Sequence, residues 1–383
     1  MALFKTPEYT LIGSKALEEA KPYLEKCGKK ALIVTGKHVV LSDMMAELKK
    51  ALEEIGIAYF VFDGITGEPT NVMIDEGIAA YKENGCDFCI GIGGGSPLDS
   101  AKAIAAMITN EGKIADYNGK VIEKPIPPVV AIPTTAGTGS EATQFTVITD
   151  VEKDIKMLLK GGYLVPKIAI VDPAYTYSAP KSITAATGMD ALTHAIEAYT
   201  SRKALPVTDT LAVSAVKRIM KYLPAAYKDG SDEKARYEMS VASYEAGICI
   251  NNSTVTLVHG MSRPIGALFH VAHGISNAML LTKCLAFALD GAYEKFANLG
   301  REIGAATAED DDKTASEKFI EALNEICKIC EIPTLLEYGI PKDEFFAHME
   351  KMAHDALTSG SPGNTMKPIS EQDMIEIYKK LWE

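Results

Sequence analysis

The sequence predicts an α/β domain followed by an all-α domain, and three observations lead to this fold class. The chain has 383 residues, more than one ordinary hydrophobic core accommodates. Short apolar runs alternate with amphipathic segments up to about residue 180, which is typical of parallel βαβ units with buried strands. Nearly all of the sequence after Pro180 has helical periodicity. We therefore expect domains at residues 1–180 and 181–383.

The individual elements of the first domain follow from their composition. Four β-rich apolar runs predict strands at Ala31–Thr35, Ala58–Phe62, Asp87–Ile92 and Val129–Ile132. Periodic segments between them predict helices at Met44–Ile55 and Val72–Asn84. In the second domain the helical pattern is interrupted at Gly230–Ser231, at the acidic run Glu309–Asp312 and at Gly360–Gly363. The acidic run is most simply a solvated loop.

Composition excludes several classes of protein. The formal charge of −12 spreads over both halves without a basic stripe, so neither nucleic acid nor an anionic membrane is an expected partner. No apolar run approaches the ~20 residues of a membrane span, and the N-terminus lacks the order of a signal peptide. The seven cysteines, including Cys86-x-x-Cys89 and Cys327-x-x-Cys330, indicate reduced core thiols. We expect a cytoplasmic protein.

A glycine-rich turn, Gly93-Gly94-Gly95-Ser96-Pro97, follows the third predicted strand. Three glycines let backbone N–H groups approach a ligand closely, and the start of the next helix offers unpaired donors to a diphosphate. Ser96 is expected to cap that helix and Pro97 to lie in its first turn. The pattern differs from the dinucleotide fingerprint G-x-G-x-x-G, so a tight turn without a ligand is the alternative.

A second polar turn follows the fourth predicted strand and runs from Thr134 to Glu141. Neighbouring parallel strands bring their carboxyl ends to the same edge of a sheet, where ligands of open α/β sheets bind. Small hydroxyl side chains there suit the ribose, phosphate or carboxamide of a cofactor. A polar connection without a ligand is the alternative.

The second domain contains a candidate metal site. Three of the seven histidines lie within fifteen residues, His259 to His273. Upstream, Asp190 and His194 are four apart and share one face of a predicted helix. One carboxylate and three imidazoles make a mixed N/O set for a divalent transition metal. The alternative is a set of buried residues that simply satisfy one another's hydrogen bonds.

Four motifs together carry a resemblance that covers essentially the whole chain. GGGSPLDSAK, AIPTTAGTGSE, GMDALTHAIEAY and VHGMSRPIGALFHVAHG occur in that order, and in this the chain resembles the iron-dependent (group III) alcohol dehydrogenase family. The resemblance implies the dehydroquinate synthase-like fold, with an α/β NAD(P)-binding domain, an all-α metal-binding domain and a cleft between them for cofactor and substrate. It implies a metal ion, Fe²⁺ or Zn²⁺, that acts as a Lewis acid during hydride transfer.

The resemblance also assigns residues. The implied metal ligands are Asp190, His194, His259 and His273. The implied cofactor-binding residues are Gly36, Glu68, Gly93, Gly94, Gly95, Ser96, Asp99, Thr134, Thr135, Thr138 and Lys156. Within the second set, the pyrophosphate is expected at the glycine turn, with Asp99 close by. The three threonines and Lys156 are expected along the cofactor towards the nicotinamide.

Two departures from the family pattern concern catalysis. Many members carry a histidine, often given a role in proton transfer, where this chain has Arg263. Arginine is effectively never deprotonated, so Arg263 cannot be a general base. Its four-residue offset places it on the His259 face, provided that the helix continues through Pro264. His270 is the nearest substitute for a proton relay, and a chain of water and ribose hydroxyls is the alternative.

Two further departures concern the cofactor. Members that prefer NAD often have an aspartate after the first strand, where this chain has Gly36, which leaves room for a 2′-phosphate. Glu68 stands where the family commonly has an asparagine beside the adenosine ribose. Its carboxylate would bond the ribose diol and repel a phosphate, so we expect NAD, with NADP as the alternative.

The sequence therefore predicts a metal-dependent NAD(P) alcohol dehydrogenase that works as a short-chain aldehyde reductase. Arg263 brings a cation whose planar fork matches a carboxylate or sulfonate, which favours sulfoacetaldehyde (reduced to isethionate) or succinate semialdehyde (reduced to 4-hydroxybutyrate). Alternatively Arg263 is structural, pairing with a carboxylate or helix carbonyls, or contacts the cofactor diphosphate. The substrate would then be neutral, such as lactaldehyde, propanal, butanal or the precursor of 1,3-propanediol.

The same fold is compatible with other functions. Glycerol dehydrogenases and dehydroquinate synthases share the fold, but the latter need a more basic pocket. A catalytically silent nucleotide-binding relative is the alternative from another class. The family-like N-terminal strand edge favours a homodimer.

Overall fold

The computed structural model describes residues 3–382, and the chain divides into two compact units between Ala179 and Pro180. The first unit is an α/β domain and the second is all-helical, as predicted from the sequence. Within the described residues, no helix is both long and apolar enough to cross a membrane. None of the seven cysteines forms a disulfide, and all except the half-buried Cys327 are buried.

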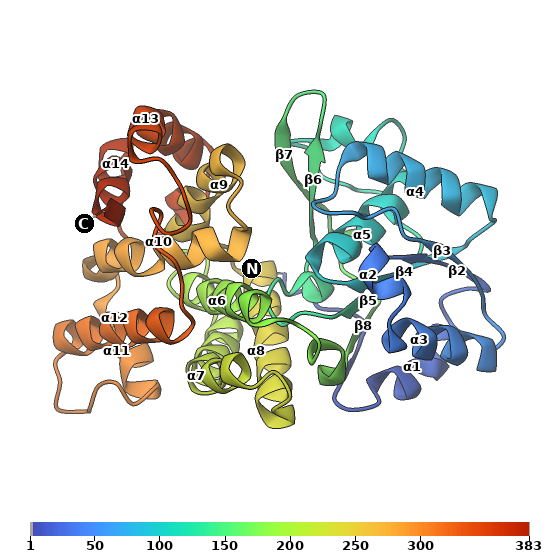
Figure 1. The fold of residues 1–383 in the computed structure, drawn as a ribbon, viewed down its shortest axis with the longest axis horizontal. Helices are drawn as coiled ribbons and strands as arrows, with labels where there is room; N and C mark the ends of the chain where they lie inside the picture. The colour runs from blue at the N-terminus through green and yellow to red at the C-terminus, as the bar shows by residue number, and fades with distance from the viewer. Residues whose placement is uncertain (1–2, 383) are drawn as a thin grey trace. The chain divides into compact units, whose positions relative to one another are not determined.

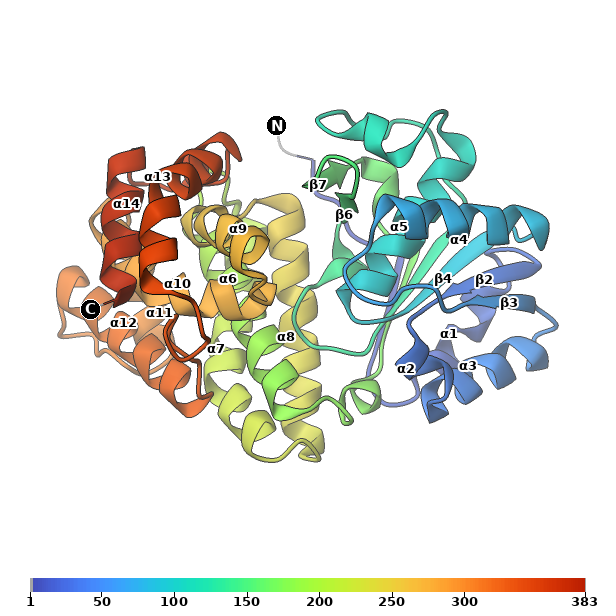
Figure 2. The ribbon, with the colours of Figure 1, turned by 45° about the horizontal axis from the view of Figure 1, so that its top comes forward.

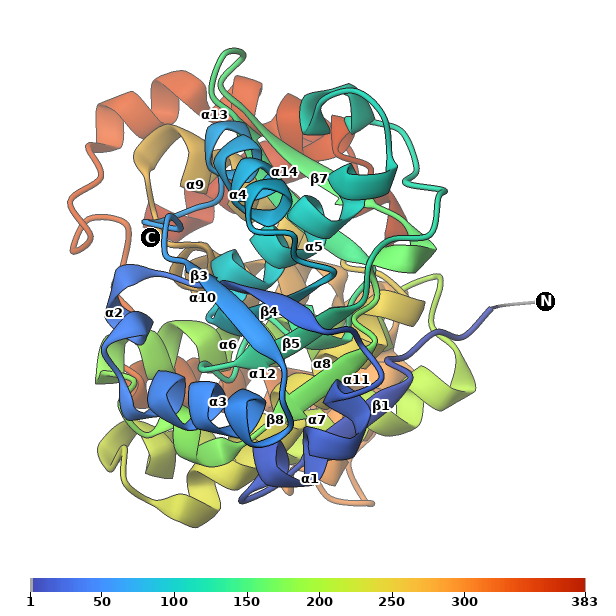
Figure 3. The same cartoon turned by 90° about the vertical axis from the view of Figure 1, so that its right-hand side faces the viewer.

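A parallel sheet forms the centre of the first unit (Figure 3). It has six strands in the order β1-β8-β5-β4-β2-β3. The strands are β1 (Tyr9–Ile12), β2 (Lys30–Val34), β3 (Ala58–Phe62), β4 (Phe88–Gly93), β5 (Val129–Pro133) and β8 (Ile168–Val171). The four predicted strands are therefore present. A two-stranded antiparallel hairpin, β6 (Phe145–Asp150) with β7 (Ile155–Lys160), is separate from this sheet.

Helices cover both faces of the sheet, because its strands are apolar on both sides (Figure 1). On one face lie α4 (Asn71–Glu83) and α5 (Gly95–Thr109), packed on one hydrophobic cluster. On the other face lie α1 (Ala16–Leu24) and α3 (Asp43–Glu54), packed on a second cluster. The short helix α2 (Lys37–Val40) follows β2.

The order of the strands reverses between β2 and β4. From β2 the chain proceeds outward to β3 and then crosses back to β4 on the opposite side, so the order reverses between β2 and β4. Ligands of open α/β sheets bind outside the carboxyl ends of strands at such a reversal. Gly36 follows β2, and Gly93–Gly95 joins β4 to α5. The register pairs Gly93 of β4 with Pro133 of β5, so the two predicted turns share one sheet edge.

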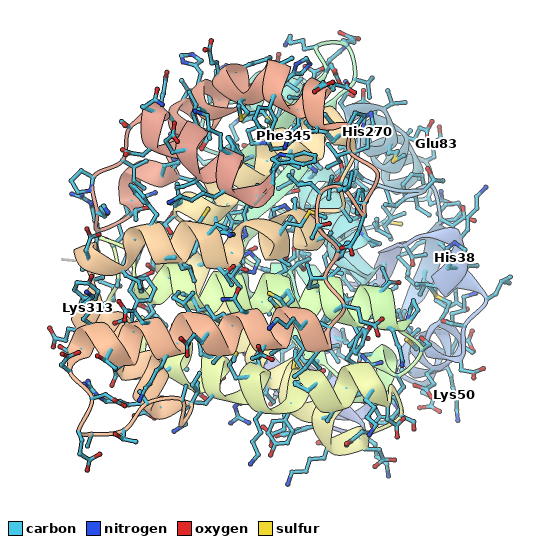
Figure 4. The ribbon with its side chains drawn as sticks, turned by 60° about the vertical axis from the view of Figure 1, so that its left-hand side comes forward. His38, Lys50, Glu83, His270, Lys313 and Phe345 are labelled. Carbon is cyan, nitrogen blue, oxygen red and sulfur yellow. The ribbon has the colours of Figure 1, made fainter. Side chains whose placement is uncertain are left out.

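The second unit is built from nine helices within the described residues (Figure 2). They are α6 (Lys181–Tyr199), α7 (Pro206–Lys228), α8 (Glu233–Asn252), α9 (Leu257–Phe269), α10 (His273–Ala288), α11 (Tyr293–Glu302), α12 (Asp312–Ile329), α13 (Lys342–Thr358) and α14 (Glu371–Lys379). Phe345 of α13, labelled in Figure 4, stacks on Phe269 of α9, with ring centroids 5.6 Å apart. This contact fixes the C-terminal helices against the helix that carries His259.

The predicted interruptions lie between helices, with one correction. Gly230–Ser231 separates α7 from α8, and Gly360–Gly363 follows α13. The acidic run is only partly a solvated loop, because Asp311 accepts a hydrogen bond from the Thr314 N–H and so caps α12. Its neighbour Asp310 forms an ion pair with Lys318 at 2.7 Å. A carboxylate at a helix N-terminus is stabilised by the unpaired N–H groups there.

Candidate metal and cofactor sites

The glycine turn joins β4 to α5 in a conformation that requires glycine at two positions. Gly93 has a φ of +147°, which side chains of L-residues rarely adopt. A Cβ on Gly95 would lie 2.9 Å from the Thr138 methyl carbon, so a side chain there would push the second turn away. The two turns are also joined directly, because the Thr134 N–H donates to the Gly93 carbonyl at 2.8 Å. The two turns are therefore in direct contact.

The structure corrects the predicted helix cap. The N-cap residue of α5 is Gly94, and Ser96 lies inside the first helical turn. Because Gly94 has no side chain, no side-chain oxygen accepts from the first N–H groups of α5. Those groups remain available to an anion, and the helix dipole favours one. The uncapped start of α5 therefore fits a pyrophosphate better than the predicted serine cap would.

Asp99 lies behind the turn and acts within the protein. One of its carboxylate oxygens accepts from the Ser140 hydroxyl at 2.5 Å, and the other accepts from the Val147 N–H at 2.8 Å. Lys102 is fully buried and donates to Ser140 at 2.8 Å and to Thr143 at 3.1 Å. Burial lowers the pKa of Lys102 to about 8. These contacts hold α5 against the polar turn Thr134–Glu141.

The predicted threonines lie at the same place. Thr134, Thr135 and Thr138 are all half-buried. The Thr138 hydroxyl accepts from the Ser140 N–H at 3.3 Å, while both side-chain branches of Thr135 would lie 3.7 Å from a Cβ on Gly94. Their contact with a cofactor stays a prediction, but the structure brings them to the glycine turn.

Glu68 and Lys156 form an ion pair that the sequence did not indicate. Glu68 follows β3, Lys156 lies on β7, and their charged atoms are 2.5 Å apart. From the sequence, Glu68 is expected at the adenosine ribose and Lys156 towards the nicotinamide. Two residues in contact cannot lie at opposite ends of an extended dinucleotide. If both bind the cofactor, they bind the same part of it.

The candidate metal ligands meet around one carboxylate oxygen in the helical unit. The Oδ1 atom of Asp190 lies 3.6 Å from Nε2 of His259, 3.6 Å from Nε2 of His273 and 3.8 Å from Nε2 of His194. Ligands held ~2.1 Å from one ion in a tetrahedral arrangement lie about 3.4 Å apart. The donor set and its spacing therefore fit a divalent transition metal.

The donor atoms of three of the four residues lie closer together than that of the fourth. The donor atoms of Asp190, His259 and His273 all lie within 4.8 Å of one another. The group does not include His194, whose ring instead stacks on that of His259, with centroids 4.6 Å apart. His194 as a fourth ligand therefore stays a prediction. The His273 side chain is 40% exposed while Asp190 is buried, so the site is open on the His273 side.

Glu197 supports this cluster and was missed in the sequence analysis. It is completely buried on α6, and its carboxylate lies 2.5 Å from Nδ1 of His259. It also accepts from the Thr256 hydroxyl at 2.8 Å and the Val258 N–H at 2.6 Å. A carboxylate on Nδ1 keeps the proton there and leaves Nε2 as the lone-pair donor for a metal.

The electrostatics of the cluster favour an ionised Asp190. Burial by itself raises the pKa of this carboxyl, but the imidazoles of His194, His273 and His259 outweigh burial and hold the pKa well below its usual value. A carboxylate that stays ionised inside a protein, with imidazole nitrogens around it, is what a divalent cation requires.

Arg263 lies on α9, which continues past Pro264 to Phe269. Its Nη1 donates to the Ser361 hydroxyl at 3.0 Å. Among residues 3–382, this is the only hydrogen bond of the guanidinium, and no carboxylate lies within 4.0 Å of it. The predicted structural pairing with a carboxylate or helix carbonyls is therefore not present. Burial lowers the pKa of Arg263, opposed by the charge of Glu197.

His270, the proposed proton relay, ends α9 in a left-handed conformation with a φ of +53° (Figure 4). It is exposed, and it makes no hydrogen bond to another described residue. No hydrogen bond among the described residues links its imidazole to the candidate metal ligands. A relay through His270 stays a prediction.

Comparison with known families gives a consistent result over both units. A family model described as iron-containing alcohol dehydrogenase matches residues 7–173. A second, described as the C-terminal part of the Fe-containing alcohol dehydrogenase family, matches residues 184–382. Together the two matches span nearly the whole chain.

Individual relatives agree with these matches. The NAD-dependent methanol dehydrogenase of Bacillus methanolicus is 38% identical over 382 residues, which cover 99% of both chains. A solved structure of 1,3-propanediol oxidoreductase superposes with a TM-score of 0.96 at 34% identity and covers 100% of both chains. Sulfoacetaldehyde reductase from Bifidobacterium kashiwanohense, solved in complex with NAD⁺, has a TM-score of 0.87 at 28% identity, covering 100% of this chain and 98% of that one.

Proposed function

The chain belongs to the iron-containing alcohol dehydrogenase family, and from this premise we propose that it reduces short-chain aldehydes with NADH at a divalent metal. It is an oxidoreductase that acts on alcohols. The observation that carries the proposal is the convergence of imidazole nitrogens on the Asp190 carboxylate, with Nε2 of His259 and of His273 each 3.6 Å away.

Residues of the helical unit would supply the ligands of the metal ion. Asp190 supplies the negative charge, and His259 and His273 supply neutral nitrogen donors. Glu197 would keep the His259 proton on Nδ1 and so leave the Nε2 lone pair for the ion. His194 is proposed as the fourth donor. A bound divalent ion supplies Lewis acidity at the substrate oxygen, and NADH supplies the hydride.

The residues of the α/β unit would bind the cofactor. The uncapped N-terminus of α5 and the backbone of Gly93–Gly95 suit the pyrophosphate. Asp99 and Lys102 hold the second turn against α5 and so position Thr138 beside Gly95. Gly36 follows β2, the strand next to β4 at the point where the strand order reverses. We propose NAD as the preferred cofactor, because Glu68 would repel a 2′-phosphate.

Replacing Glu68 by glutamine is expected to raise the ratio of NADPH to NADH use. The change removes a negative charge and also frees Lys156, whose ammonium is bound by Glu68. Both effects favour a 2′-phosphate. Because the pair is partly exposed and screened by solvent, we expect the ratio of kcat/KM values to shift by roughly three- to tenfold. Steady-state kinetics with both cofactors measures it.

Lys156→Met provides the matched control, because it removes the cation and leaves Glu68 unpaired. It is expected to change the same ratio in the opposite direction. A wild-type protein that already prefers NADPH would show that the open space at Gly36 decides the preference. Equal ratios in all three proteins would show that the pair does not contact the adenosine ribose.

For the substrate, we propose a small aldehyde that carries an anionic group. Arg263 has a guanidinium with one neutral partner, Ser361, and no carboxylate within 4.0 Å among the described residues. It lies one helical turn after His259 on α9. A guanidinium donates two parallel hydrogen bonds to a carboxylate or sulfonate. Sulfoacetaldehyde and succinate semialdehyde fit this description, and one structural relative is a sulfoacetaldehyde reductase.

A neutral substrate is the second candidate, because the more similar relatives are a methanol dehydrogenase and a 1,3-propanediol oxidoreductase. A panel of aldehydes separates the two candidates. NADH oxidation is followed with sulfoacetaldehyde, succinate semialdehyde, propanal, lactaldehyde and 3-hydroxypropanal, using metal-loaded protein. The anionic proposal requires the highest kcat/KM for one of the first two. No turnover with any aldehyde, with or without Fe²⁺ or Zn²⁺, would contradict the proposed activity itself.

A homodimer is a further proposal from the fold. Among the described residues, the strand β1 pairs with β8 alone and lies at the edge of the sheet, where its outer backbone groups can pair with another strand. Light scattering of the purified protein tests it.

A further inference from the structure

A fifth side chain, Asn277, lies among the candidate metal ligands. Asn277 is completely buried on α10, one turn after His273 and on the same face of the helix. Its Nδ2 atom lies 2.7 Å from Oδ1 of Asp190 and 3.2 Å from Nε2 of both His259 and His273. One amide nitrogen therefore contacts all three donor atoms of the convergent group.

The positive hydrogens of this amide group reduce the repulsion between the three lone-pair donors, as a cation would. Three lone-pair donors that face one another repel when nothing positive lies among them, and the NH₂ group places its positive hydrogens there. The amide orientation is determined by this contact, because turning it over would put Oδ1 of Asn277 2.7 Å from the Asp190 oxygen. In the observed orientation, Oδ1 of Asn277 is buried without a hydrogen-bond partner among the described residues. The contacts of the nitrogen must offset that cost.

The amide and a metal ion compete for the imidazoles but not for the carboxylate. The Nε2 atom of a neutral imidazole has one lone pair, which either accepts from the amide or binds the ion. A carboxylate oxygen has two lone pairs and can do both. The amide has two hydrogens, so besides its bond to Asp190 it offers one hydrogen, which the two imidazole nitrogens share. An ion that binds His259 and His273 must displace this shared hydrogen, whereas the bond from Asn277 to Asp190 can persist.

We propose that Asn277 is a positioning residue that substitutes for the ion in the metal-free protein and yields the two imidazoles when the ion binds. This inference rests on the proposed metal site. Replacing Asn277 should therefore change the metal affinity in the opposite direction to replacing a supporting residue such as Glu197. Loss of a supporting residue weakens metal binding, whereas loss of a competitor strengthens it and destabilises the metal-free state.

The test uses full-length protein carrying Asn277→Ala, with Asn298→Ala as the matched control. Asn298 donates to the Tyr199 hydroxyl at 2.9 Å and takes no part in the cluster. Thermal unfolding is measured for chelator-treated and Zn²⁺-loaded protein, and the Zn²⁺ Kd is measured by chelator competition.

Asn277→Ala should lower the Tm of the metal-free protein by about 2–4 °C and that of the loaded protein less. Its Zn²⁺ Kd should fall roughly three- to tenfold. Asn298→Ala should shift both forms equally and leave the Kd unchanged.

A second variant keeps the test decisive if metal-free Asn277→Ala does not fold. Asn277→Asp removes the amide and places a second carboxylate beside Asp190, so its metal-induced rise in Tm should exceed that of the wild-type protein. Weaker Zn²⁺ binding by Asn277→Ala, or equal shifts in both forms, would overturn the inference and leave the metal site intact. If the wild-type protein does not bind Zn²⁺ or Fe²⁺ at one ion per chain, the proposed metal site itself is wrong.

Discussion

Replacing His273 by alanine is expected to lower aldehyde reduction by about 1000-fold or more and to remove the divalent metal from the protein. His273 supplies one of the three donor atoms that lie within 4.8 Å of one another. An ion with fewer donors binds more weakly, and the neighbouring residues cannot replace a missing ligand. Loss of the Lewis acid removes several kcal/mol of stabilisation from the transition state of hydride transfer.

The exposure of His273 makes this the most informative ligand to change. Its side chain is 40% exposed, so its removal leaves no sealed cavity, whereas removal of His259 would leave the buried Glu197 carboxylate without its imidazole. Metal content, NADH oxidation and calorimetric NAD binding are measured together. NAD binding should persist, because the glycine turn belongs to the other unit. His354→Ala, which changes an exposed histidine in the same unit, is the control. Full activity in a metal-free His273→Ala protein would contradict the proposed function.

The cofactor-binding edge could be predicted because its determinants are local. Glycine at 93 and 95 and a buried apolar strand before them indicate a close backbone approach from composition alone. The identity of the N-cap could not be predicted in the same way. Ser96 is the better capping residue by propensity, but α5 starts two residues before the predicted first turn because Gly93 turns the chain early.

Supporting residues of the metal site were harder to predict than its ligands. Glu197 comes three residues after His194, so its helical spacing was a usable signal for a carboxylate on the ligand face. Asn277 is likewise four residues after His273. Neither type of residue indicates a metal site by itself, since buried glutamate and asparagine serve many hydrogen-bond networks. Their contacts depend on how α6, α9 and α10 pack, which periodicity does not determine.

The strands that were not predicted are either short or lie outside the main sheet. Two of them, β1 and β8, have four residues each, too few for a reliable alternation. The hairpin of β6 and β7 is partly polar and exposed, and it lies outside the main sheet. It nevertheless carries Lys156, whose pairing with Glu68 is a contact between segments 88 residues apart. Such distant contacts are decided by tertiary packing.

Replacing Arg263 by alanine is expected to raise the KM for the anionic aldehyde about 100-fold while changing the kinetics with propanal by less than about threefold. A bidentate, charge-assisted contact contributes roughly twice as much as a neutral hydrogen bond, and a propanal molecule has no group that could use it. Arg263 can make this contact because its guanidinium has only the Ser361 hydroxyl as a partner among the described residues. Arg263→Lys should give an intermediate KM, because it keeps the charge and loses the planar fork.

The Ser361→Ala variant separates anion recognition from a structural role. It removes the one hydrogen bond that Arg263 makes to the segment after α13 and leaves the guanidinium in place. If Arg263 acts by holding that segment, Ser361→Ala should reproduce the losses of Arg263→Ala on every substrate, with a matching fall in Tm. If Arg263 binds the anionic group, Ser361→Ala should retain the preference for the charged aldehyde. Equal losses on charged and neutral aldehydes in Arg263→Ala, or a wild-type preference for propanal, would contradict anion recognition, because a cation that binds the substrate must discriminate by charge.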